Sequence, residues 1–181
     1  MKKIAALIAS GSGMGADAAK HLSSKGFEVA IMSSTNKATK LADELGGYGY
    51  IGSNLVKENI DEFISGVYKK YKRIDVLINS AGHGPKGEIL EINDEEWIKG
   101  MEVYFLNVVR AARIITPIMQ KQNNGSIINI STFAIFEPES SFPEYTRIYV
   151  NLPTYGSVII LKARALKGSS TFGFLNNSTS E

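Results

Sequence analysis

Three glycines, Gly11, Gly13 and Gly15, have the residue type and spacing that most directly suggest chemistry. Glycine has no Cβ, so its backbone turns sharply and a bulky anion can come close to main-chain N–H groups. The pattern after Gly15 is helical, and the positive N-terminal end of a helix attracts the same anion. This combination favours a nucleotide diphosphate. The alternative is a plain strand-to-helix turn, because short glycine-rich turns join strands to helices in many folds.

The elements that would position these glycines follow from the apolar pattern. Residues 4–9 are all apolar, which is typical of a strand in a parallel sheet covered on both faces. The same analysis predicts helices at residues 15–25, 35–45, 60–71 and 94–120, and strands at residues 27–32, 48–52, 74–78 and 126–130. Such alternation predicts an α/β fold, a Rossmann-like doubly wound parallel sheet with helices on both faces.

Composition limits the classes of function. A chain of 181 residues is long enough for one well-buried domain. Its net charge of +2 comes from 20 basic and 18 acidic side chains spread along the chain, so we expect no nucleic-acid partner. With no cysteine and two histidines, we also expect no disulfide and no metal site.

Two apolar stretches resemble targeting or membrane segments. Two lysines precede the apolar run near the N-terminus, but six apolar residues are too few for a signal peptide and are explained as a strand. Residues 103–119 contain Asn107, Arg110, Arg113 and Pro117, which argues against a membrane span. We therefore expect a cytoplasmic protein without a membrane partner.

Polar residues after the second predicted strand bear on the choice of nucleotide. In an open parallel sheet, ligands bind beyond the carboxyl ends of the strands. Ser33, Ser34, Thr35 and Lys37 follow the second strand, where an NAD site usually has an acidic residue. Hydroxyls and a lysine suit a 2′-phosphate better, which favours NADP over NAD. A plain turn rich in serine and threonine is the alternative.

The turn after the fourth predicted strand has the sequence Asn79-Ser80-Ala81-Gly82, and with the three glycines it resembles the short-chain dehydrogenase/reductase family. In that family the Asn-Asn-Ala-Gly turn lies against the cofactor and steadies the central strands. The resemblance implies an NADP- or NAD-binding site made of Gly11, Ser12, Gly13, Met14, Gly15, Ser33, Ser34, Asn54, Asn79, Ala81 and Gly82.

The cofactor motifs also depart from the family pattern. Ser80 replaces the second asparagine of the turn, and Ile8-Ala9 stand where the family commonly has Thr-Gly. Asn54 occupies the place, after the third strand, where the family has an Asp or Asn touching the adenine.

The resemblance extends to three catalytic candidates, Asn107, Thr132 and Tyr145. Asn107 lies in the long predicted helix, where an asparagine satisfied against a neighbouring carbonyl is the structural alternative. Thr132 precedes Tyr145 by the family's thirteen-residue interval, and Ser131 is the alternative hydroxyl donor. By resemblance, Tyr145 would give its proton to a carbonyl oxygen during hydride transfer.

The lysine that the family places four residues after its tyrosine is Tyr149 here. A phenol titrates near 10, so acid–base work near neutrality needs its anion stabilised by roughly 3 to 4 kcal/mol. A charge four residues away on a helix would face the tyrosine, whereas Arg147 would face away. The catalytic step is therefore the part of the resemblance that fails first.

The resemblance ends near residue 147, and Pro153 should kink or end any helix there. We divide the chain into a Rossmann-type domain at residues 1–150 and an atypical C-terminal tail at residues 151–181, lacking the last strands of the family. The abrupt change suggests a truncation or a shifted reading frame in the gene.

Three hypotheses remain open: an NAD(P)-dependent oxidoreductase acting on a small-molecule carbonyl or alcohol, a nucleotide-binding pseudoenzyme, and a truncated product. The long predicted helix is apolar on more than one face. Because that helix contributes to subunit contacts in the resembling family, we expect a homo-oligomer, either a dimer or a tetramer. The alternative is that the tail folds over this helix.

Overall fold

The computed structural model describes residues 1–80, 91–130 and 158–161. The strands are β1 (Ile4–Ile8), β2 (Glu28–Ser33), β3 (Tyr48–Ile51), β4 (Val76–Ser80), β5 (Ser126–Ile130) and β6 (Val158–Leu161). The helices are α1 (Gly13–Ser24), α2 (Lys37–Glu44), α3 (Lys57–Tyr71), α4 (Asp94–Met101) and α5 (Asn107–Lys121), with the π-helical turn η1 (Glu102–Leu106) between the last two.

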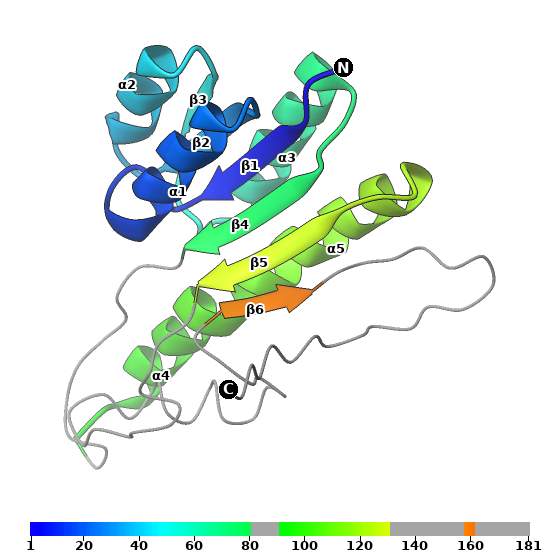
Figure 1. The fold of residues 1–181 in the computed structure, drawn as a ribbon. Coiled ribbons are helices and arrows are strands. Elements are labelled where there is room, and N and C mark those ends of the chain that lie inside the picture. The colour runs from blue at the N-terminus through cyan, green and yellow to red at the C-terminus, as the bar shows by residue number, and fades with distance from the viewer. Residues whose placement is uncertain (81–90, 131–157, 162–181) are drawn as a thin grey trace, which may run out of the picture.

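These strands form a single sheet in the order β3-β2-β1-β4-β5-β6 (Figure 1). The first five are parallel, as predicted, so their carboxyl ends meet at one edge. β4 begins and ends two residues later than the sequence predicted. Its end is later because Asn79 pairs with Ile8 of β1, which extends the ladder past the apolar run.

β6 is an element that the sequence analysis did not predict. It runs antiparallel to β5, with Val158 opposite Ile130 and Leu161 opposite Ile127. The sequence of β6, Val-Ile-Ile-Leu, is rich in β-branched residues and therefore suits a strand, although it is only four residues long. The short run lies inside a segment without a clear period, which is why the pattern did not single it out.

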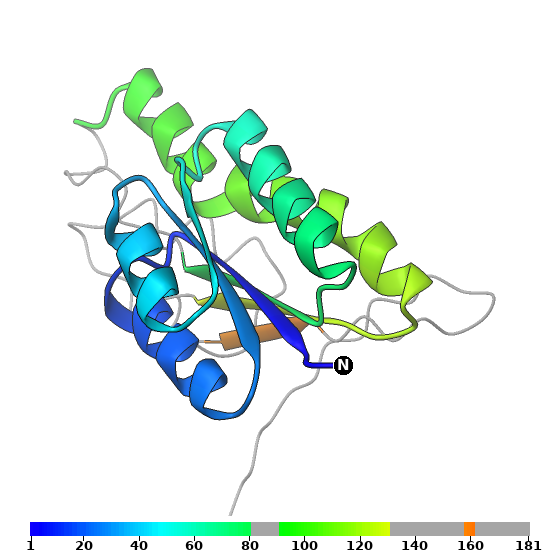
Figure 2. The ribbon, with the colours of Figure 1, turned by 90° about the horizontal axis from the view of Figure 1, so that it is seen from above.

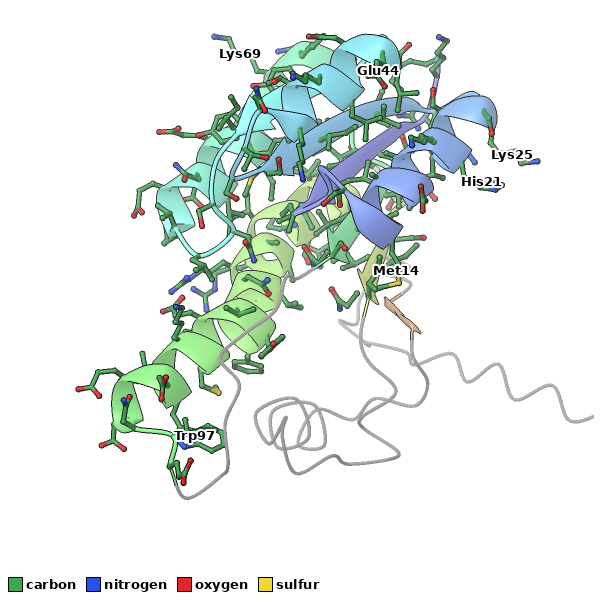
Figure 3. The ribbon with its side chains drawn as sticks, turned by 90° about the vertical axis from the view of Figure 1, so that its left-hand side faces the viewer. Met14, His21, Lys25, Glu44, Lys69 and Trp97 are labelled. Atoms are coloured by element: carbon green, nitrogen blue, oxygen red, sulfur yellow. The ribbon has the colours of Figure 1, made fainter. Side chains whose placement is uncertain are left out.

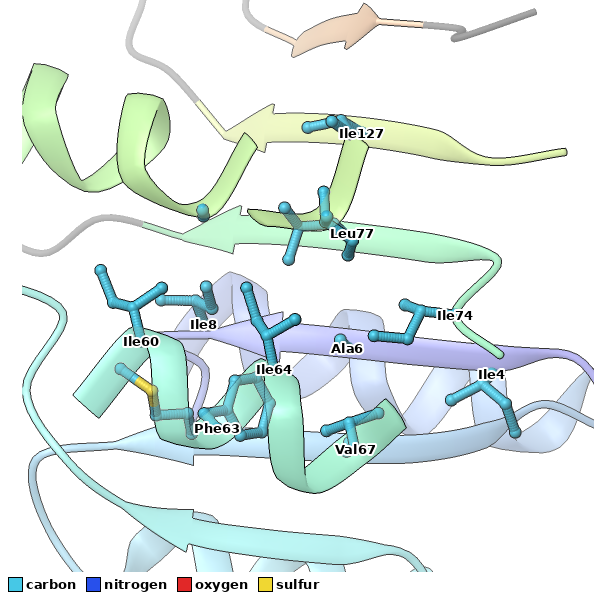
Figure 4. Packing of buried hydrophobic residues seen from close by; sticks show 14 of the residues in the cluster. Ile4, Ala6, Ile8, Ile60, Phe63, Ile64, Val67, Ile74, Leu77 and Ile127 are labelled. Carbon is cyan, nitrogen blue, oxygen red and sulfur yellow. The ribbon is translucent and has the colours of Figure 1, made fainter. Parts of the chain in front are cut away.

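Helices cover both faces of the sheet: α1 and α2 lie on one side, α3 and α5 on the other (Figure 2). All five residues of β1 are buried, and their side chains alternate between two apolar clusters. Ala5 and Leu7 pack on the side of α1 and α2. Ile4, Ala6 and Ile8 pack on the side of α3 and α5, in the larger cluster that Figure 4 shows with Phe63 and Ile64 of α3. A strand buried on both faces explains the continuous apolar run.

One long helical rod, α4–η1–α5, replaces the single α-helix predicted at residues 94–120. It starts at a capping box, in which Asn93 accepts from the backbone N–H of Glu96 while the Glu96 side chain accepts from the N–H of Asn93. The π-helical turn then interrupts the α-helix before Asn107. π-helical turns inside α-helices occur frequently at functional sites.

The opposite edge of the sheet, at the amino ends of the strands, is held by a buried carboxylate. Asp75 is 3% exposed and accepts hydrogen bonds from the backbone N–H of Ile4, from the guanidinium of Arg73 and from the Asn124 side chain. Burial alone would raise the pKa of Asp75, but hydrogen bonds and charge, chiefly from Arg73, outweigh it and hold that pKa below its usual value. This network ties β1, β4 and the start of β5 together.

Candidate functional site

The turn between β1 and α1 lies at the carboxyl edge of the sheet, where the sequence placed an anion site. Gly13 has φ +58°, and no atom of the described residues lies within 4 Å of the position a Cβ would take, so its backbone is open on that side within that part of the chain. By contrast, a Cβ on Gly15 would lie 2.8 Å from Ser10 Cα, and a Cβ on Gly11 would lie 2.6 Å from Ser33 Oγ. Gly11 and Gly15 therefore allow close packing inside the protein, and Gly13 leaves room outside it.

Ala9, just before this turn, has φ +56°, a left-handed conformation that strains a residue with a Cβ. The resembling family commonly has glycine at this place in its motif. The sequence comparison identified the substitution at Ala9, but the positive φ is visible in the structure alone.

The start of α1 has the electrostatics of an anion site. No acidic side chain lies in its first turn, and the N-cap residue Ser12 makes no side-chain capping hydrogen bond. The first N–H groups of a helix have no intrahelical partner and carry partial positive charge. Met14 is 67% exposed and projects from this end of α1, as Figure 3 shows. The turn therefore presents N–H donors without a competing carboxylate.

Residues after β2 adjoin the same turn. The Ser33 hydroxyl donates to the carbonyl of Thr35, while Ser34 is exposed. Lys37 begins α2, and its Cβ lies 3.0 Å from the position of a Cβ on Gly11. The stem of a lysine thus starts beside the glycine turn, and this lysine is an exposed residue.

The loop after β3 brings Asn54 to the same edge of the sheet. The backbone N–H of Gly52 donates to the carbonyl of Ser33, which joins the ends of β3 and β2. Asn54 Nδ2 is buried and makes no hydrogen bond within the part of the chain that the structure describes. A buried amide donor without a partner is costly, so a ligand atom at this position would stabilise the site.

Asn79 and Asn129 lie at the ends of β4 and β5, and the side chains of both are buried. Asn79 Nδ2 donates to Asn129 Oδ1, which leaves the nitrogen of Asn79 engaged within the protein. Four of the predicted site residues lie outside the described residues: Ala81, Gly82, Thr132 and Tyr145.

Asn107 is the first residue of α5 and directly follows the π-helical turn. It is 2% exposed, and its Oδ1 has no hydrogen-bond partner among the residues that the structure describes. An amide donates to a carbonyl through its nitrogen, so the alternative of an asparagine satisfied against a neighbouring carbonyl concerns Nδ2 and stays a prediction beside the catalytic role. Asn107 offers an acceptor atom to a group beyond it.

Sequence reasoning missed one pair of side chains near these residues. Arg110 of α5 forms an ion pair with Glu102 of η1 and also donates to the carbonyl of Leu55, in the loop that carries Asn54. The spacing of eight residues between Glu102 and Arg110 is not a usual helical pairing, so the pattern gave no signal for it.

The residues present fit a dinucleotide with its diphosphate at the start of α1. Three features lie at the carboxyl edge of the sheet: the open backbone at Gly13, the N-terminus of α1 without a side-chain cap, and the donor of Asn54, which has no partner among the described residues. In doubly wound sheets a dinucleotide lies across this edge with its diphosphate on the first helix. Of the helices that the structure describes, none combines the length and the apolar character needed to cross a membrane.

Comparison with known proteins supports this assignment. A family model described as short chain dehydrogenase matches residues 3–147. An uncharacterized oxidoreductase of Staphylococcus epidermidis is 28% identical over 147 residues, which are 80% of this chain and 64% of that protein. The family match thus ends at the residue where the sequence resemblance was expected to stop.

Solved structures agree on the fold. The L-sorbose reductase of Gluconobacter frateurii, complexed with NADPH and L-sorbose, is 25% identical with a TM-score of 0.75, covering 83% of this chain and 60% of its own. A 7α-hydroxysteroid dehydrogenase complexed with NADH has a TM-score of 0.75 at 18% identity, covering 82% of this chain and 60% of its own, which supports the fold alone. The chain spans less than two thirds of the length of each of these relatives.

Proposed function

Because the chain belongs to the short-chain dehydrogenase family, we propose that it binds NADP or NAD at the carboxyl edge of its sheet and transfers hydride between the nicotinamide and a carbonyl or alcohol substrate. The fit of the glycine turn carries this proposal: Gly13 is open where Gly11 and Gly15 are closely packed. When bound, the nicotinamide supplies or accepts the hydride. The protein supplies the binding groups and the proton.

The binding groups are assigned by their position. The N–H groups of Ser12, Gly13 and Met14 hold the diphosphate at the start of α1. Asn54 donates to the adenine side, where its Nδ2 otherwise lacks a partner among the described residues. The further cofactor residues implied by the resemblance are Gly11, Gly15, Ser33, Ser34, Asn79, Ala81 and Gly82.

Lys37 and Ser34 support a preference for NADP over NAD. Both are exposed, Lys37 starts beside the glycine turn, and no acidic residue stands in the loop from Ser33 to Lys37. An ammonium group stabilises a 2′-phosphate, whereas an acidic side chain would hold the ribose hydroxyls of NAD. Calorimetric titration with NADPH and NADH tests this preference.

The Lys37→Ala variant should lose affinity for NADPH by about tenfold while its affinity for NADH changes little. Lys40→Ala is the matched control, because Lys40 is an exposed lysine of the same helix. Equal losses in the two lysine variants would show that Lys37 acts only through the general charge of α2.

For the chemical step, we propose Tyr145 as the proton donor, Thr132 as a hydrogen-bond donor to the carbonyl oxygen, and Asn107 as the third member of the set. Asn107 has support from its buried oxygen beside the π-helical turn, which has no hydrogen-bond partner in the described part of the chain. Incubation with NADPH and a panel of ketones tests turnover, with the consumption of NADPH as the measured quantity. Tyr145→Phe should abolish that turnover and leave NADPH affinity unchanged.

Tyr149, in place of the family lysine, favours a second candidate: a nucleotide-binding protein with impaired catalysis. This candidate expects NADPH binding without turnover on any ketone of the panel. Tyr149→Lys should then raise turnover by supplying the missing charge near Tyr145. No gain in Tyr149→Lys would count against a role for the missing lysine.

We also propose a homo-oligomer. Ile98 and Met101 of α4 are 64% and 37% exposed, and such apolar surface on a helix favours burial against another subunit. Light scattering of the purified chain tests this proposal, and Ile98→Glu should lower the measured mass if α4 lies in the contact.

A further inference from the structure

Arg110 connects two segments that are far apart in the sequence. Its guanidinium donates to both carboxylate oxygens of Glu102, one of them at 3.0 Å. It also donates to the carbonyl oxygen of Leu55 at 3.2 Å, across 55 residues of sequence. The planar fork of an arginine can hold a carboxylate on two atoms and a further acceptor, which the compact ammonium of a lysine does less well. Arg110 therefore fixes the loop after β3 against the long helical rod.

The loop that Arg110 contacts is otherwise held from within and from α3. The backbone N–H of Ser53 donates to Asn59 Oδ1 at 3.0 Å, and the N–H of Leu55 donates to Ser53 Oγ at 3.2 Å. These bonds shape the loop but do not set its distance from α5. The bond from Arg110 to Leu55 does, one residue after Asn54.

Both joined segments carry a buried amide with an unpartnered atom in the described part of the chain. These atoms are Asn54 Nδ2, on the loop, and Oδ1 of Asn107, on the helix. Asn107 and Arg110 are three residues apart in α5, so they lie on the same face of that helix. The ion pair thus stands where the adenine side of the proposed cofactor site meets the π-helical turn.

Arg110 also balances the negative charge of Glu102. The side chains of Arg110 and Glu102 are 20% and 28% exposed, so each partly loses its hydration and depends on the other. Without the guanidinium, the Glu102 carboxylate would remain near a site proposed to bind an anionic dinucleotide. Loss of Arg110 would therefore release the loop and leave an uncompensated negative charge.

We propose that Arg110 is a positioning residue for the adenosine half of the dinucleotide: its contacts with Glu102 and Leu55 hold Asn54 in place against the long helix. This inference rests on the proposed function, since it assumes a dinucleotide at the carboxyl edge. It assigns Arg110 no contact with the cofactor. Its effect passes through Leu55 to Asn54.

The first experiment measures hydrogen exchange in the ligand-free chain and does not depend on the proposed function. Arg110→Ala should speed exchange by about tenfold in a peptide covering residues 53–56 and leave β1 unchanged. Arg113→Ala is the matched control, because it removes an exposed arginine from the same helix. Unchanged exchange at residues 53–56 in Arg110→Ala would overturn the inference.

The second experiment measures affinity for NADPH and for adenosine 2′,5′-bisphosphate, which carries only the adenosine half. Arg110→Ala should lose affinity for both ligands by a similar factor, about five- to tenfold, while Arg113→Ala keeps both affinities. Affinities that stay unchanged in Arg110→Ala, or a loss confined to NADPH, would overturn the inference.

Two further results separate this inference from the proposed function. An unmodified chain that binds neither ligand would overturn the proposed function and with it the role at the adenosine half. If Arg110→Ala does not fold, Arg110→Lys decides: it keeps the charge but not the two-atom geometry, and should give a smaller loss in the same two assays. Wild-type exchange and affinities in Arg110→Lys would then overturn the inference.

Discussion

Asn79 Nδ2 donates to Asn129 Oδ1 at 2.7 Å, and the two residues are paired in register on neighbouring parallel strands. They are 2% and 6% exposed, so this hydrogen bond joins two amides inside the sheet. A shift of β5 by one residue would move the Asn129 side chain to the other face of the sheet and leave Asn79 unpaired. The pair therefore specifies the register of β4 and β5 close to the proposed site.

Removing one amide of this pair should destabilise the protein more than removing both. Asn129→Leu leaves a buried donor on Asn79, which costs about 1–3 kcal/mol of unfolding free energy. The double variant with leucine at both positions leaves neither group unsatisfied and should cost less than the sum of the single changes. Urea denaturation of the four proteins measures this difference, and strictly additive losses would show that the hydrogen bond does not couple the two side chains.

Ala9→Gly should stabilise the protein. Ala9 has φ +56°, a conformation that costs an alanine about 1–2 kcal/mol and a glycine almost nothing. Because glycine also gives the unfolded chain more freedom, the expected net gain is about 0.5–1 kcal/mol. Thermal unfolding measures it. Ala30→Gly, at a fully buried position of β2 without positive φ, is the contrasting control and should destabilise.

Alanine at Gly15 and at Gly13 should separate stability from binding. A Cβ at Gly15 would press on the backbone of Ser10, so Gly15→Ala should lower the melting temperature strongly. A Cβ at Gly13 meets no atom of the described residues within 4 Å, so the expected loss of stability is the cost of the positive φ, about 1–2 kcal/mol. Gly13→Ala should nevertheless lose NADPH affinity, because its Cβ enters the open space assigned to the diphosphate. Unchanged affinity in a folded Gly13→Ala variant would contradict that assignment.

The stability that Asp75 contributes should depend on pH. Its pKa in the folded protein lies below the usual value, so the unfolded chain takes up the proton more readily. The contribution is therefore complete above the unfolded pKa of about 4 and is lost as the pH falls through the lower folded pKa. Asp75→Asn should be less stable than the unmodified protein at neutral pH, and the difference should narrow as the pH falls below about 4.

Urea denaturation at several pH values measures this effect of Asp75. Asp43→Asn is the control, because Asp43 is an exposed residue of α2 and should leave the pH dependence unchanged. A difference between the unmodified protein and Asp75→Asn that stays constant with pH would mean that the loss is one of packing rather than of charge.

The sequence predicted the parts of this fold that depend on local pattern. A fully apolar run of strand length is sufficient to identify β1, and the helical spacing of Ile60, Phe63, Ile64 and Val67 identifies the buried face of α3. The glycine turn could likewise be placed, because it joins a predicted strand to a predicted helix.

The features that the sequence did not predict depend on contacts between distant residues. The bond from Arg110 to Leu55 and the pairing of β6 with β5 join segments with no shared period. The end of β4 was also misplaced, because its pairing with β1 extends the strand beyond the apolar run. The π-helical turn has no composition signal of its own. Two of the three catalytic candidates, Thr132 and Tyr145, lie outside the described residues, so their roles stay predictions.

A single-codon deletion within residues 103–106 would have a smaller effect than the same deletion elsewhere in the rod. The π-helical turn there accommodates one residue more than an α-helical turn. Loss of that residue would close the turn into regular α-helix and leave α4 nearly in phase with α5, whereas a deletion inside α5 would rotate everything before it by about 100° relative to the rest of that helix. Ile98 and Met101 would keep their direction after the first deletion, and Glu102 would stay on the side of Arg110. The π-helical turn is therefore the place where this rod tolerates a change of length.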